Sequence, residues 1–114
     1  MNKVKITVLR TEFYPELADA YITDGRAAGP CSLLHAGDTF VFEGNAKMPE
    51  GFCPWAWIDI YRNVSTLAAG GTYTPWSLRD GETIACCTDG IRPVVFHLEA
   101  FAQEPSIEKD GSGK

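Results

Sequence analysis

Alternation of apolar and polar residues predicts a half-buried strand at the start of the chain, over residues 3–9. Its apolar members are Val4, Ile6 and Val8, and its polar members are Lys3, Lys5 and Thr7. Shorter runs rich in β-forming residues predict three more strands, over residues 38–43, 83–88 and 92–98. Strands and helices do not alternate regularly, which favours an antiparallel sheet over a doubly wound parallel one.

The last two strands are predicted to form a hairpin, because Asp89-Gly90 lies between them. Pro93 complicates this arrangement. In a two-residue turn it would oppose Cys86 at a position that needs an N–H group, so we expect a bulge or an edge strand there.

The main helix is predicted from Pro54 to about residue 69. Its apolar stripe comprises Trp57, Ile60, Tyr61, Val64, Leu67 and Ala68, and Gly70-Gly71 provides the stop. Cys53 falls at the expected N-cap, and Phe52 is placed to act as a hydrophobic staple. A shorter helix is predicted over residues 15–21, with proline in its first turn.

These elements predict one α+β domain over residues 1–102. Its architecture is a small curved antiparallel sheet or partial barrel, with the helix at about 54–69 packed on it. The chain length of 114 residues fits a single domain. Residues 103–114 are polar and are expected to form a flexible tail.

Charge and hydropathy exclude some classes of function. The formal charge is −5 and the basic residues form no stripe, so we expect no nucleic-acid binding. No run of about 20 apolar residues is present, so we expect no membrane association. The N-terminal residues lack the apolar segment of a signal peptide, which predicts a cytoplasmic location.

Four cysteines in a reducing compartment suggest thiol or metal chemistry rather than disulfides. Cys31 follows Gly29-Pro30, and Cys53 stands where a helix start favours the thiolate. The leading hypothesis is a cysteine-ligated metal centre, iron–sulfur or otherwise zinc, with ligands from Cys31, Cys53, Cys86 and Cys87. The spacing matches no sequential metal motif, and free cysteines are also common as small buried apolar residues.

Cys86 and Cys87 are adjacent on a predicted strand, so their side chains point to opposite faces of the sheet. Only one of them is therefore expected to reach a common site, unless a bulge re-aims the other. The sequence leaves open which one does so.

Two alternatives use no metal. In the first, a cleft binds a small molecule or a redox partner protein, with Arg92 as a polar anchor and His35 as a further candidate residue. The apolar walls would come from Phe52, Trp55, Trp57, Tyr73 and Trp76. In the second, Cys53 is an enzyme nucleophile and His35 is its base. Whether the protein is an enzyme, and its oligomeric state, stay open.

Two segments give the chain a specific resemblance. Residues 48–57 (MPEGFCPWAW) and 86–96 (CCTDGIRPVVF), together with residues 4–9 and Gly29-Pro30-Cys31, resemble an uncharacterised family of small proteins. That family is widespread in anaerobic bacteria and archaea and is sometimes labelled a repeat family. The resemblance covers about residues 3–99 and implies a domain identity without an established function. An anaerobic setting would favour iron–sulfur or thiolate chemistry.

Overall fold

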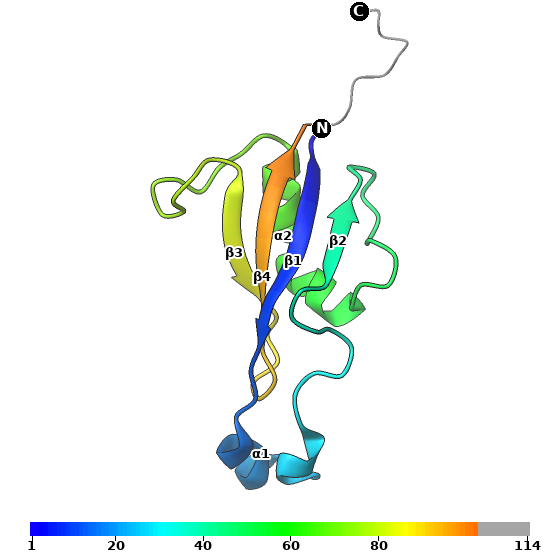
Figure 1. Cartoon of the computed structure of the whole chain (residues 1–114), viewed down its shortest axis with the longest axis vertical. Coiled ribbons are helices and arrows are strands. Elements are labelled where there is room, and N and C mark those ends of the chain that lie inside the picture. Colours follow the sequence, from blue (N-terminus) through cyan, green and yellow to red (C-terminus); the bar gives the residue numbers. More distant parts are fainter. Residues whose placement is uncertain (103–114) are drawn as a thin grey trace, which may run out of the picture.

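Four antiparallel strands form an open sheet in the order β2-β1-β4-β3 in the computed structural model, which describes residues 1–102 (Figure 1). The strands are β1 (Lys3–Thr11), β2 (Thr39–Phe42), β3 (Glu82–Cys86) and β4 (Val94–Phe101). The predicted α+β class with a small curved antiparallel sheet is confirmed, and the sheet does not close.

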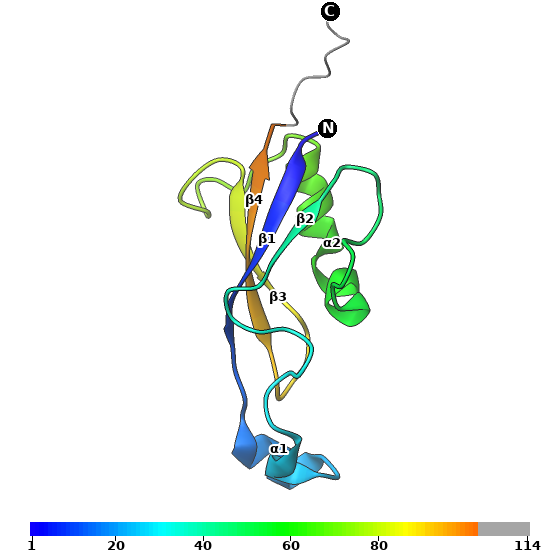
Figure 2. The ribbon, with the colours of Figure 1, turned by 45° about the vertical axis from the view of Figure 1, so that its right-hand side comes forward.

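One face of the sheet carries the hydrophobic core, because the alternating apolar residues of the strands all point to that side. Helix α2 (Pro54–Ala68) packs on this face, and Figure 2 shows it beside the sheet. The strands contribute Val4, Ile6, Val8, Phe42, Val94, Phe96 and Leu98 to the core, and the helix contributes Ala56, Ile60, Val64, Leu67 and Ala68. The opposite face of the sheet carries polar and partly exposed residues such as Lys5, Ile84 and His97.

The start of α2 follows the prediction closely. Cys53 is the N-cap residue with an extended backbone, and Pro54 occupies the first turn. The Phe52 ring packs edge-on against Trp57 with 6.0 Å between centroids, as expected for a hydrophobic staple. After the helix, Gly70 has φ +91°, a conformation that glycine adopts without strain.

The apolar stripe of α2 differs in its centre from the predicted one. Ala56 is buried, whereas Trp57 and Tyr61 are only partly buried at the edge of the core. Both rings pack against Phe42 of the edge strand β2, at centroid distances of 5.7 and 6.2 Å. Their size lets them cover the sheet edge from the flank of the helix, while the smaller Ala56 faces the sheet.

The connection between β3 and β4 is longer than a two-residue turn, because β3 ends at Cys86 and β4 begins at Val94. Pro93 therefore precedes the strand, and its carbonyl accepts a hydrogen bond from the Glu12 N–H group. Neither predicted alternative describes Pro93, because it lies in the connection just before β4, which is a central strand. A register shift occurs instead between β1 and β4, at Val8–Arg10.

A helical segment connects β1 to β2 and stands away from the sheet (Figure 1). It contains α1 (Pro15–Tyr21), where a helix was predicted, and the short 3₁₀ helix η1 (Gly25–Ala28). The Asp19 carboxylate joins them by accepting hydrogen bonds from the Arg26 backbone N–H at 2.8 Å and Nε at 2.7 Å. The expected flexible tail, residues 103–114, lies outside the described residues.

Neither α1 nor α2 has the length and apolar character needed to cross a lipid bilayer, and no other helix among residues 1–102 does.

Candidate functional site

Three separate segments enclose a cleft of about 520 Å³ beside the N-terminus of α2. They are residues 31–34 after η1, residues 53–56 at the start of α2, and the connection between β3 and β4. The lining residues are Cys31, Ser32, Leu33, Leu34, Cys53, Trp55, Ala56, Cys87, Thr88, Asp89, Arg92 and Val94. This volume is in the range of small-molecule sites.

The cleft gathers three of the four cysteines, one from each segment. Cys31, Cys53 and Cys87 line it, whereas Cys86 does not. All three cleft cysteines are partly buried, and Cys86 is exposed. The structure therefore places Cys87, and not its neighbour, at the common site.

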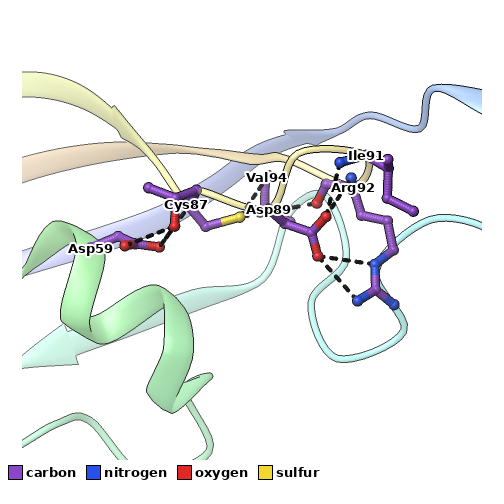
Figure 3. Close-up of polar contacts among 7 residues, drawn as sticks. Asp59, Cys87, Asp89, Ile91, Arg92 and Val94 are labelled. Atoms are coloured by element: carbon purple, nitrogen blue, oxygen red, sulfur yellow. Dashed lines mark hydrogen bonds and ion pairs between the residues drawn. The ribbon is translucent and has the colours of Figure 1, made fainter. Parts of the chain in front are cut away.

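Cys87 is held by the backbone at the end of the hairpin. Its N–H donates to the Val94 carbonyl at 3.1 Å, and its Sγ accepts a hydrogen bond from the Val94 N–H at 3.3 Å. The Sγ also lies 4.0 Å from the Arg92 carbonyl oxygen. Figure 3 shows the sulfur directed toward Val94. The thiol is consequently fixed in orientation as part of the cleft wall.

Cys86 projects to the other face of the sheet, as the alternation of strand residues requires. Its Sγ lies 3.1 Å from the Cys87 carbonyl oxygen and donates to it. Although the residue is exposed, desolvation of its thiol raises the pKa of Cys86, and the nearby Cys87 and Asp59 raise that pKa further. Cys86 is thus a protonated thiol at neutral pH, and thiolate is the form that binds metals and reacts as a nucleophile.

Arg92 provides the one cationic side chain among the lining residues of the cleft, and Asp89 fixes its position. The Asp89 Oδ2 accepts from Arg92 Nε at 3.1 Å, and its Oδ1 accepts from the backbone N–H groups of Ile91 and Arg92 (Figure 3). Burial alone would raise the pKa of Asp89, but these backbone hydrogen bonds and the Arg92 charge hold that pKa below its ordinary value. Asp89 is the turn residue that the sequence predicted.

One contact that positions the cleft was missed in the sequence. The Asp59 carboxylate on α2 accepts hydrogen bonds from the Thr88 N–H at 2.8 Å and the Thr88 hydroxyl at 3.0 Å. This contact connects α2 to the β3–β4 connection, on the side of the cleft where Thr88 lies. No local pattern could have revealed it, because the partners are 29 positions apart.

Several residues proposed for the cleft lie elsewhere. Phe52 is buried in the core, Trp57 packs on Phe42, and the Tyr73 hydroxyl accepts a hydrogen bond from Asn63 Nδ2 at 3.1 Å. His35 is outside the lining of the cleft, and its Nδ1 is 3.8 Å from Asp38. Trp76 lines a second pocket beside the edge strand β3. Of the predicted wall and anchor residues, Trp55 and Arg92 line the cleft.

The metal hypothesis requires at least three ligands close together. Among residues 1–102, no three Cys, His, Asp or Glu side chains are grouped closely enough to hold a metal ion. The three cleft thiols therefore share a wall without forming a preassembled metal site, and the metal centre stays a prediction.

Comparisons of the chain with family models, curated proteins and solved structures find no match. The resemblance drawn from residues 48–57 and 86–96 accordingly stays a prediction.

Proposed function

We propose that the protein binds a small, mainly apolar molecule in the cleft lined by Cys31, Cys53 and Cys87. The convergence of three chain segments on one cleft of about 520 Å³ is the observation that supports this function. Apolar walls with a few fixed polar groups are typical of small-molecule sites. Leu33 and Trp55 are 65% and 71% exposed, so their apolar surface is available to a ligand.

The polar groups of the cleft favour a ligand with one acceptor or anionic group. Asp89 engages Arg92 through Nε and Nη2, and the five N–H donors of a guanidinium leave others for a ligand. Because Asp89 neutralises much of the positive charge, we expect a single acceptor rather than a multiply charged phosphate compound.

Anilinonaphthalene sulfonate is a suitable probe, since it combines apolar rings with one sulfonate. We expect it to bind the native protein saturably, and Trp55→Ala to weaken binding about tenfold by removing an exposed aromatic wall. Fluorescence titration measures both affinities. Tyr21→Ala is the control, because Tyr21 is an aromatic residue of similar exposure, 82%, and lines neither pocket.

Unchanged binding by Tyr21→Ala together with weaker binding by Trp55→Ala supports the cleft. The reverse pattern, or no saturable binding to natively folded protein, contradicts it. Near-ultraviolet circular dichroism of both variants verifies that each is folded before the titrations are compared.

A second candidate is a cysteine-ligated centre, iron–sulfur or zinc, with Cys31, Cys53 and Cys87 as thiolate ligands. The shared cleft favours it, although the ligands would have to move closer when the metal binds. Anaerobic purification followed by metal and sulfide analysis tests this candidate. Stoichiometric metal that is lost in Cys87→Ser and retained in Cys86→Ser would support it, whereas metal-free protein with four titratable thiols would refute it.

A cytoplasmic location fits either candidate. All four cysteines are unpaired in the described structure, as expected for a protein kept in a reducing environment. Differential alkylation of the protein inside cells tests this, since oxidised cysteines would contradict the proposed location.

A further inference from the structure

A second pocket of about 430 Å³ lies beside the edge strand β3, and neither candidate function uses it. Its lining residues are Trp76, Ser77, Leu78, Arg79, Glu82, Thr83, Ile84 and His97. Trp76, Leu78 and Ile84 are 76%, 86% and 53% exposed, which is unusual for three neighbouring large apolar side chains. The pocket therefore presents an open aromatic and aliphatic wall.

The loop that carries Trp76 is fixed by hydrogen bonds. The Asp80 carboxylate accepts from the Thr74 hydroxyl at 2.8 Å and from the Thr72 hydroxyl at 3.2 Å. The Ser77 hydroxyl donates to the Thr83 hydroxyl at 2.9 Å, which ties the loop to β3. Trp76 is consequently held beside the sheet without being covered by it.

The floor of the pocket contains a connected set of charged groups. The Glu82 carboxylate accepts two hydrogen bonds from Arg79, at 2.9 and 3.3 Å, and lies 2.9 Å from His97 Nε2. Hydrogen bonds from Arg79 and then His97 lower the pKa of Glu82 to about 2, so the carboxylate is ionised at neutral pH. An ionised carboxylate can only accept hydrogen bonds.

This fixes the tautomer of His97. Nε2 must carry the proton that is donated to Glu82, so in the neutral ring Nδ1 is a hydrogen-bond acceptor. Within residues 1–102, no donor engages Nδ1. The lining of the pocket thus includes an exposed aromatic ring, aliphatic side chains and a histidine whose Nδ1 acceptor has no donor among the described residues.

We propose that this second pocket binds a planar ring compound that bears one N–H or O–H donor, with the ring packed on Trp76 and the donor bonded to His97 Nδ1. The aliphatic surfaces of Leu78 and Ile84 cover the remaining apolar edge of the ring. Because Arg79 and Glu82 neutralise each other, the pocket favours a neutral heteroaromatic or phenolic compound over a strongly charged one.

Indole and N-methylindole test the proposal, because they share the same ring and a methyl group replaces the N–H donor in the second. Nitrogen-15 NMR of the histidine rings and of the tryptophan indole groups is recorded during titration into the full chain. Indole is expected to shift the His97 and Trp76 signals saturably at millimolar concentration. N-methylindole is expected to bind about threefold to tenfold more weakly, as the loss of one hydrogen bond predicts.

Variants separate the two contacts. Trp76→Ala is expected to weaken the binding of both compounds at the second pocket. Trp55→Ala replaces a similarly exposed tryptophan in the first cleft and is expected to leave the binding of both compounds at the second pocket unchanged. His97→Phe keeps a ring but removes the acceptor, so it should abolish the preference for indole. These outcomes together support the proposal.

Three results would overturn it: equal affinity for the two compounds, a His97 spectrum of the Nδ1-protonated tautomer, or no saturable shift of Trp76. If Trp55→Ala weakens binding and Trp76→Ala does not, the compounds bind in the first cleft and the proposal is wrong.

Discussion

The Asp59 carboxylate on α2 lies 2.8 Å from the backbone nitrogen of Thr88 and accepts its hydrogen bond. The Thr88 hydroxyl donates to the same carboxylate at 3.0–3.1 Å. A carboxylate that accepts both donors of one residue holds the β3–β4 connection against the helix. Since this connection carries Cys87 and Arg92, the contact also determines the shape of the first cleft.

Replacing Asp59 by alanine should release that connection. We expect a loss of about 1–2 kcal/mol in the free energy of unfolding, because charge-assisted hydrogen bonds are removed. Thr88→Val keeps the backbone donor and should cost less. Urea denaturation measures both, with Asp24→Ala, which makes no side-chain cap hydrogen bond to η1, as the control. Equal stability of Asp59→Ala and the wild type would contradict the assigned role.

Phe52 is the second structural support of the cleft, because it precedes the N-cap Cys53 and is only 3% exposed. Its ring contacts Phe40 at 5.0 Å and Trp57 at 6.0 Å between centroids. Phe52→Ala should therefore reduce the free energy of unfolding by about 3–5 kcal/mol. Phe101→Ala, the same change at an exposed strand end, should stay within about 0.5 kcal/mol. If Phe52→Ala and Phe101→Ala lower the free energy of unfolding by similar amounts, Phe52 has no special role in stabilising the start of α2.

The stability of the protein should depend on pH through Glu82. Its pKa is lowered from 4.5 to about 2 in the folded protein, chiefly by Arg79 and then by His97. Folding therefore favours the ionised form, and this contribution is present above about pH 4.5 and is lost as the pH falls toward 2. Urea midpoints across this interval should fall less steeply in Glu82→Gln than in the wild type. Glu99→Gln, on the neighbouring strand, should retain the wild-type slope.

Thiol alkylation should report occupancy of the first cleft. With anilinonaphthalene sulfonate bound, reaction of Cys31, Cys53 and Cys87 with iodoacetamide should slow severalfold, and reaction of Cys86 should not change. Peptide mass spectrometry gives the rate at each site. If alkylation of Cys86 slows as much as alkylation of the other three thiols, the probe lowers thiol reactivity without occupying the cleft specifically.

Periodicity was sufficient to predict the first strand and the main helix, and runs of β-forming residues were sufficient to predict the other three strands. Val4, Ile6 and Val8 alternate, and Pro54 and Gly70 mark the helix ends by local backbone chemistry. The predicted fold class follows from these local signals, and so does Cys53 as the N-cap residue.

The composition of the two pockets could not be predicted in the same way. Trp55 and Trp76 have similar exposure but lie in different pockets, and only the path of the chain assigns them. The contact from Asp59 to Thr88 and the pairing of Glu82 with His97 join residues on separate elements. Strand alternation predicted that Cys86 and Cys87 point to opposite faces of the sheet. Which of the two thiols lines the cleft depends on where α2 packs, and the sequence does not show this.

The segment from α1 to η1 has a practical consequence for engineering. Its buried Ala18 is outside the central hydrophobic cluster, and Asp19 and Arg26 hold the two helices to each other. A spectroscopic label or a fused peptide inserted at Tyr21, which is 82% exposed, would disturb neither pocket lining. The position between β1 and β2 is thus a natural attachment point for immobilising the protein without modifying the lining of either pocket.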